Sequence, residues 1–112
     1  MSNHGGRQLD HGRGTIDMLP EIVKEVDGRA EIVVDGGFCR GADIVKAIAS
    51  GADAVAIGKI QGLGLGADGQ AGVVRVLELL EIEMNTVMGL LGLACFEKPS
   101  VCPLYTYPSP LD

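Results

Sequence analysis

Apolar residues recur at helical spacing after a polar, glycine-rich opening. Residues 1–14 contain four glycines and show no periodicity, which predicts a loop. From Ile16 to Val26 the apolar positions fall three and four residues apart, as on one face of an amphipathic helix. We expect Asp17 to cap this helix, which leaves Pro20 in the first turn, where a missing backbone amide costs little.

Two β-branched segments alternate with helices in the middle of the chain. Glu31–Asp35 and Ala52–Ile57 are short, apolar and followed at once by glycine, which predicts buried parallel strands. Gly41–Ser50 between them has helical periodicity. Strands that alternate with helices predict an α/β fold with a parallel sheet. Since two strands cannot complete such a sheet, the pattern asks for more strands than this chain contains.

A long amphipathic helix is expected near the end of the chain. Gln61–Gly69 predicts a glycine-rich connection, and residues 71–91 predict the helix. Four prolines after Ala94 predict an extended tail, so we divide the chain into a folded part, 1–93, and a proline-containing tail, 94–112. The predicted core face of the helix consists of Val73, Val76, Leu77, Leu80, Met84, Val87, Met88 and Leu91.

Composition narrows the possible functions. The 112 residues are 46% hydrophobic and 21% charged, as in globular domains, and the net charge of −6 disfavours broad contact with nucleic acid. The polar start indicates no signal peptide, and no apolar run is long enough to span a membrane. The three cysteines have no metal-ligand spacing, which predicts a reduced, cytoplasmic protein without a metal site.

The two strand ends are candidates for a phosphate site. Asp35-Gly36-Gly37 and Gly58-Lys59 follow the predicted strands, where ligands of parallel α/β folds bind. Glycine lets backbone amides reach phosphate oxygens, and Arg40 and Lys59 supply positive charge. Either turn alone is better explained as a tight βα turn without a ligand. The two turns together with the nearby cations favour phosphate binding.

The opening loop places His4 three residues before Arg7, among glycines. Imidazole accepts a proton near neutral pH, and guanidinium binds a carboxylate through two hydrogen bonds. The pair therefore suits a small substrate with a carboxylate beside an acidic position. From the spacing alone, a solvated loop without a function is the better interpretation.

Three segments bear on that choice. SNHGGRQLD (2–10), DGGFCRG (35–41) and AIGK (56–59) are similar, in order and spacing, to the closing segments of the FMN-dependent α-hydroxy-acid oxidase and dehydrogenase family. The resemblance runs to about Gly92, and the first segment is its most specific part. It implies an FMN-binding (β/α)₈ TIM barrel, of which this chain is the C-terminal portion with about the last two strands.

The resemblance also implies a role for each site residue. His4 would take the proton of a 2-hydroxy acid, Arg7 would bind its carboxylate, and the product would be a 2-oxo acid. Lys59 stands where better-known members carry arginine, and Cys39 stands where many carry arginine, which leaves Arg40 as the nearby cation. The implied FMN-binding residues are Asp35, Gly36, Gly37, Phe38, Cys39, Arg40, Gly58 and Lys59.

Other hypotheses remain beside this one. The chain is alternatively an inactive truncated fragment that functions only with a partner chain, associating through exposed edges. Full-length members are expected to be homo-oligomers. A different phosphate-binding barrel, related to IMP dehydrogenase, is disfavoured by the opening loop. Gly64–Gly69 fits G-x-G-x-x-G, but it does not follow a strand directly and no strand comes after it, so we interpret it as a flexible link.

Overall fold

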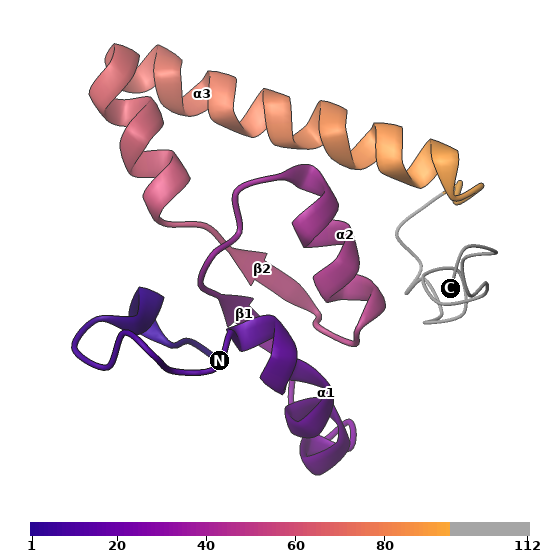
Figure 1. Ribbon diagram of the computed structural model, residues 1–112. Helices are drawn as coiled ribbons and strands as arrows, with labels where there is room; N and C mark the ends of the chain where they lie inside the picture. Colours follow the sequence, from indigo (N-terminus) through magenta and orange to yellow (C-terminus); the bar gives the residue numbers. More distant parts are fainter. Residues whose placement is uncertain (95–112) are drawn as a thin grey trace, which may run out of the picture.

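A computed structural model describes residues 1–94. The chain forms a 3₁₀ turn (η1, His4–Gly6) and then alternates helices with strands (Figure 1). The predicted tail, apart from Ala94, lies outside the described residues. The helices and strands are α1 (Thr15–Val26), β1 (Val33–Asp35), α2 (Gly41–Ala49), β2 (Ala54–Ala56) and α3 (Lys59–Leu90).

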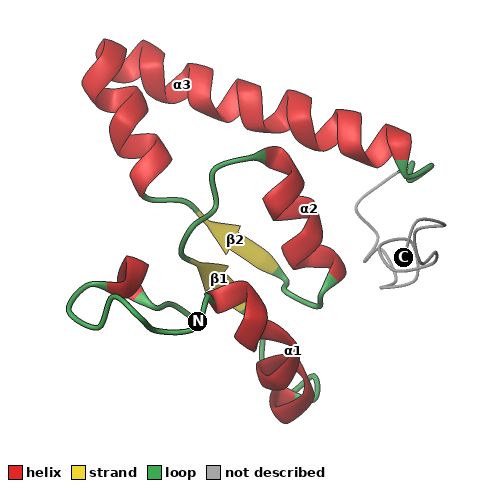
Figure 2. Ribbon diagram, viewed as in Figure 1, coloured by secondary structure: helices red, strands yellow, loops and turns green. Residues whose placement is uncertain are grey.

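The described part of the chain contains one sheet, formed by β1 and β2. The strands are parallel, with Val34 opposite Val55, which confirms the predicted α/β alternation, although both strands are shorter than expected (Figure 2). On the other edge of β1, the Met1 amine donates to the Val33 carbonyl (2.5 Å), and the Asp35 amide donates to the Met1 carbonyl (3.0 Å). This is the hydrogen-bond pattern of a parallel neighbour, so Met1 extends the ladder beyond β1.

The core forms around β1. Leu19 of α1 and Val34 of β1 are fully buried, and Phe38 from the turn after β1 packs in the same cluster with Ala47 of α2. Burying a large side chain stabilises the fold by about 1.5–3 kcal/mol. Because Phe38 lies in this core, the turn that follows β1 is anchored to the body of the fold.

The start of α1 differs from the prediction. The helix begins at Thr15 with Gly14 as its N-cap, and Asp17 lies in the first turn without a side-chain capping bond. Pro20 is therefore more than one turn into the helix. The helix begins earlier because Thr15 is buried and its hydroxyl donates to the Gly36 carbonyl (3.2 Å), a long-range contact that local pattern does not report.

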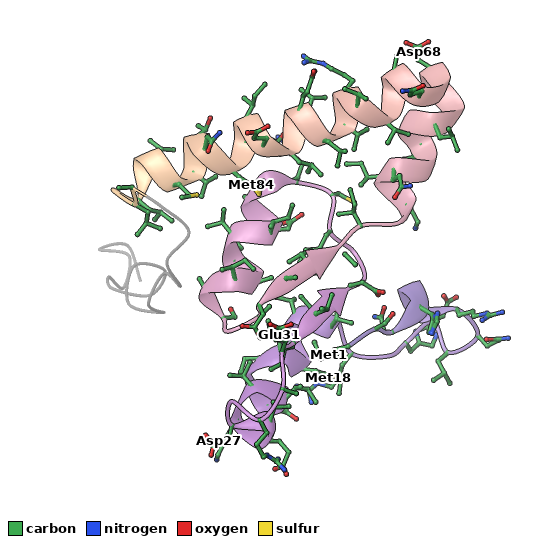
Figure 3. All side chains as sticks on the ribbon, turned by 180° about the vertical axis from the view of Figure 1, so that it is seen from behind. Met1, Met18, Asp27, Glu31, Asp68 and Met84 are labelled. Carbon is green, nitrogen blue, oxygen red and sulfur yellow. The ribbon has the colours of Figure 1, made fainter. Side chains whose placement is uncertain are left out.

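The expected glycine-rich link is helical. α3 begins at Lys59, after Ile57 and Gly58 at the end of β2, and bends at Asp68 and Gly69, where the backbone leaves helical geometry. Figure 3 labels Asp68 at this corner. The two arms meet at Gly64 and Gly72, where a Cβ on Gly72 would lie 2.0 Å from the Gly64 carbonyl oxygen. The glycines therefore serve helix packing, and the interpretation of 64–69 as a flexible link is wrong.

The predicted core face of α3 is only partly buried. Leu80 and Met88 are buried and α3 packs on α2, whereas Leu77 is 53% exposed. The contact is close at Gly41, whose Cβ would lie 2.5 Å from the Met84 backbone nitrogen. Leu77 lies on the same arm of α3 as Leu80, so contact with α2 buries only part of the predicted face. No helix within residues 1–94 is long and apolar enough to cross a bilayer.

Candidate functional site

A pocket of about 790 Å³ opens at the carboxyl ends of β1 and β2. It brings together three segments far apart in the sequence: the opening loop (residues 2–14), the β1–α2 turn (residues 35–41) and the start of α3. Arg7 and Arg40 do not line it. The predicted site residues that do are His4, Asp35, Gly36, Gly37, Phe38, Cys39, Gly58 and Lys59.

Gly36 shapes the β1–α2 turn. Its φ is +106° and that of Gly37 is +85°, in the region that favours glycine. A Cβ on Gly36 would lie 2.7 Å from Asn3 Oδ1 and 3.3 Å from Thr15 Oγ1. The turn therefore approaches the opening loop as closely as backbone allows, and side chains at this position are excluded.

Carboxylates hold the other end of the turn. Asp43 Oδ2 accepts hydrogen bonds from the amides of Cys39 (3.2 Å) and Arg40 (3.0 Å). Glu83 Oε2, on α3, accepts a hydrogen bond from the Gly41 amide (2.7 Å). The backbone that leaves the pocket and enters α2 is thus fixed by two side chains, one from α2 and one from α3.

Arg40 is the N-cap of α2, and its side chain pairs with Glu83 of α3 and does not line the pocket. Its Nε donates to Glu83 Oε2 (3.1 Å), and its Nη2 lies 2.8 Å from Oε1. The guanidinium and the Gly41 amide hold the pKa of the Glu83 carboxyl below its ordinary value, and the carboxylate raises the pKa of Arg40. Arg40 is therefore paired with Glu83 in this structure, and its contact with a cofactor stays a prediction.

Two lysines border the pocket. Lys59 begins α3, and Lys46 lies on α2. Within residues 1–94, no ion pair engages either ammonium. The sequence did not indicate Lys46 as a site residue, because lysine is an ordinary residue on the polar face of an amphipathic helix. Its place beside the strand tips becomes visible only when α2 packs next to β2.

His4 is tied to the β1 end through Ser2. The Ser2 hydroxyl donates a hydrogen bond to Asp35 Oδ1 and accepts one from the His4 amide (3.1 Å). Asn3 Oδ1 accepts the Gly5 amide (2.9 Å), which starts the 3₁₀ turn. His4 and Arg7 are both exposed, but His4 lines the pocket and Arg7, three residues on, does not.

Backbone strain marks the same loop. His4 (φ +52°), Arg7 (φ +34°) and Asp10 (φ +46°) are non-glycine residues in the left-handed region. Such conformations cost about 1–3 kcal/mol each and concentrate at functional sites. The far end of the loop is fastened by Arg13, whose Nη2 lies 2.7 Å from Glu21 Oε1 on α1.

The relatives of this chain settle its family. The sequence family described as FMN-dependent dehydrogenase matches residues 1–100. The chain belongs to this family. An L-lactate oxidase from Nostoc sp. is 54% identical over 92 residues, which cover 82% of this chain and 25% of that protein. The human 2-hydroxyacid oxidase 1 is 49% identical over 92 residues, with the same coverage.

Solved structures agree with this placement among the FMN-dependent dehydrogenases. Mandelate oxidase with (S)-2-phenylpropionate is similar with a TM-score of 0.83 and 47% identity, covering 89% of this chain and 30% of that chain. An active mutant of (S)-mandelate dehydrogenase has a TM-score of 0.83 and 39% identity, covering 89% and 28%. The chain thus spans about a quarter to a third of the length of these relatives.

Proposed function

We propose that this chain supplies the substrate loop and the cofactor-phosphate site of an FMN-dependent enzyme that oxidises a 2-hydroxy acid to a 2-oxo acid. The observation that carries the proposal is the pocket in which His4 meets two glycine-rich strand ends and Lys59. These strands would be about the last two of a (β/α)₈ barrel, the fold in which phosphate sites lie at the final strand ends.

The residues present fit the phosphate end of FMN. Gly36 and Gly37 line the pocket without side chains, so a phosphate can approach their backbone closely. Gly58 precedes α3, and no side chain caps this helix start. Anions are favoured at such a helix start, because its first amides have no partner within the helix. Lys59 adds a positive charge with no ion pair in the described residues. Lysine keeps the charge of arginine but not its planar fork, so we expect phosphate to be held less rigidly.

The loop residues would act on the substrate. Oxidation of a 2-hydroxy acid removes two electrons and two protons, and FMN when bound supplies the electron acceptor. His4 would accept one proton at its imidazole, and Arg7 would hold the carboxylate through paired hydrogen bonds. Because Arg7 lies outside the pocket lining, we propose that it reaches the carboxylate once further barrel elements pack against the loop.

The alternative is a chain that is inactive alone and works only with a partner that contributes the other strands. Two points favour it: the described strands cannot close a barrel, and apolar residues of α3 such as Leu63 and Leu65 are exposed. We expect the purified chain to bind FMN weakly and to show no turnover of lactate, glycolate or mandelate. Measurable turnover by the chain alone would refute this part of the proposal.

A chimaera tests the proposed roles directly. Replacing the matching quarter of the Nostoc L-lactate oxidase with this chain should give an FMN-binding enzyme that oxidises L-lactate. His4→Gln should lower its kcat about a hundredfold or more, since general base catalysis contributes that much. Arg7→Lys should mainly raise KM. His11→Gln, a change of the second histidine in the same loop, is the control and should leave kcat unchanged. Equal loss in both histidine variants would contradict the assignment of His4.

A further inference from the structure

The β1–α2 turn receives its outer support from a residue 42 positions away in the sequence. Glu83, on the second arm of α3, accepts hydrogen bonds from the Gly41 amide (2.7 Å) and from Arg40 Nε (3.1 Å). Its second oxygen lies 2.8 Å from Arg40 Nη2. The carboxylate is therefore shared between the guanidinium and the first amide of α2. Figure 3 labels Met84, the next residue, where α3 passes the start of α2.

We infer that Glu83 is a positioning residue for the FMN site, acting through Arg40 and the Gly41 amide to hold the β1–α2 turn in its binding conformation. The inference rests on the proposed function only in that FMN is taken as the ligand of this turn. Glu83 does not line the pocket, so it acts on the cofactor through the backbone that it fixes.

The packing of α3 on α2 supports this inference independently of charge. Gly41 meets the backbone of α3 so closely that a Cβ would lie 2.6 Å from the Leu80 carbonyl oxygen and 2.5 Å from the Met84 nitrogen. This contact brings Glu83 within reach of an amide at the start of α2. Two neighbouring amides, those of Cys39 and Arg40, bond instead to Asp43 of α2 itself.

Because Asp43 and Glu83 accept hydrogen bonds from different amides, a local role of Glu83 can be distinguished from a positioning role. If Glu83 only satisfied the Gly41 amide, its loss would expose that amide alone. If it holds the turn, its loss should also open the Cys39 and Arg40 amides, although neither bonds to Glu83. The state of those two amides therefore reports whether the effect reaches the turn.

Hydrogen exchange of the full chain, measured by NMR without ligand, tests the inference. Glu83→Gln should accelerate exchange of the Cys39 and Arg40 amides by about tenfold, because a charge-assisted contact holding a local unit has been removed. Glu78→Gln is the matched control, since Glu78 pairs with Arg75 (3.0 Å) on the same helix and has no bond to α2. Exchange at Cys39 and Arg40 that is equal in the two variants overturns the inference.

A second arm measures FMN binding by flavin fluorescence at a temperature where circular dichroism shows all chains equally folded. Glu83→Gln should raise the dissociation constant several-fold over that of Glu78→Gln, and Glu83→Asp should restore part of the difference. An FMN affinity unchanged in Glu83→Gln would overturn the link to the cofactor. A wild-type chain that binds no FMN would count against the proposed function, and exchange would still decide whether Glu83 positions the turn.

Discussion

The β1–α2 turn and the opening loop contribute to the same pocket but are built differently. The turn is held at both ends: Phe38 lies in the core, Thr15 donates to the Gly36 carbonyl, and Asp43 and Glu83 bind its last amides. The opening loop is fastened at Ser2–Asn3 and at Arg13, and Leu9 near its tip is 79% exposed. The proposed phosphate site is therefore formed by this chain itself, whereas the proposed substrate site needs further contacts.

The largest expected effect is on the free energy of unfolding when one apolar side chain is truncated in each of the two regions. Phe38→Ala should lower the free energy of unfolding by about 3 kcal/mol or more, because it empties part of the core. Leu9→Ala should change it by less than about 0.5 kcal/mol, since the side chain is largely in solvent. Urea denaturation followed by circular dichroism measures both values. A similar loss in the two variants would show that the loop is as tightly packed as the turn.

Glycine substitutions sharpen the contrast. Gly36→Ala should cost about 2–3 kcal/mol, because an unfavourable φ is joined by a contact of 2.7 Å with Asn3. Gly5→Ala meets a φ of +67° with no atom within 4 Å, so strain alone should cost about 1 kcal/mol. The same denaturation experiment compares them. If Gly5→Ala proved the more damaging, the loop rather than the turn would be the more constrained region.

The smallest expected effect is on the pH dependence of stability, through the ion pair that holds each region. The hydrogen bond and the charge of Arg13 lower the pKa of Glu21. Hydrogen bonds from Arg40 and from the Gly41 amide, together with the charge of Arg40, lower the pKa of Glu83. A lowered folded-state pKa gives a stabilisation that is present above the ordinary value of 4.5 and is lost as the pH falls through the folded value. Unfolding measured from about pH 6 to about pH 3 should therefore show a shallower decline in Glu21→Gln and in Glu83→Gln than in wild type. A decline in both variants as steep as in wild type would mean that neither ion pair persists in solution.

Local pattern predicted the elements whose residues face the core at regular spacing. The alternation of α1, β1, α2 and β2 and the two glycine-ended strands were predicted, because Val34 and its neighbours form apolar runs ended by glycine. Gln61–Gly69 was not, because glycine normally disfavours helix. Here Gly64 and Gly72 permit two helical arms to touch, a benefit that depends on packing.

The site was predicted unevenly for the same reason. His4 and the strand-end glycines carry signals within a few residues, and all of them line the pocket. Arg40 was assigned by its proximity in sequence to the turn, but its direction is decided by Glu83, 43 residues later. Pairing over such a distance leaves no local pattern, and Glu83 reads as one of many acidic positions on an exposed helix.

The account depends most on the claim that the strand tips hold the phosphate of FMN, and comparison with riboflavin tests it. Riboflavin lacks the phosphate and keeps the rest of the ligand, so fluorescence titration of the full chain with both isolates that group. We predict that FMN binds at least about tenfold more tightly, and that Lys59→Gln removes most of the difference while Lys24→Gln, on α1 outside the pocket lining, does not. Equal affinity for FMN and riboflavin in the wild-type chain would contradict it.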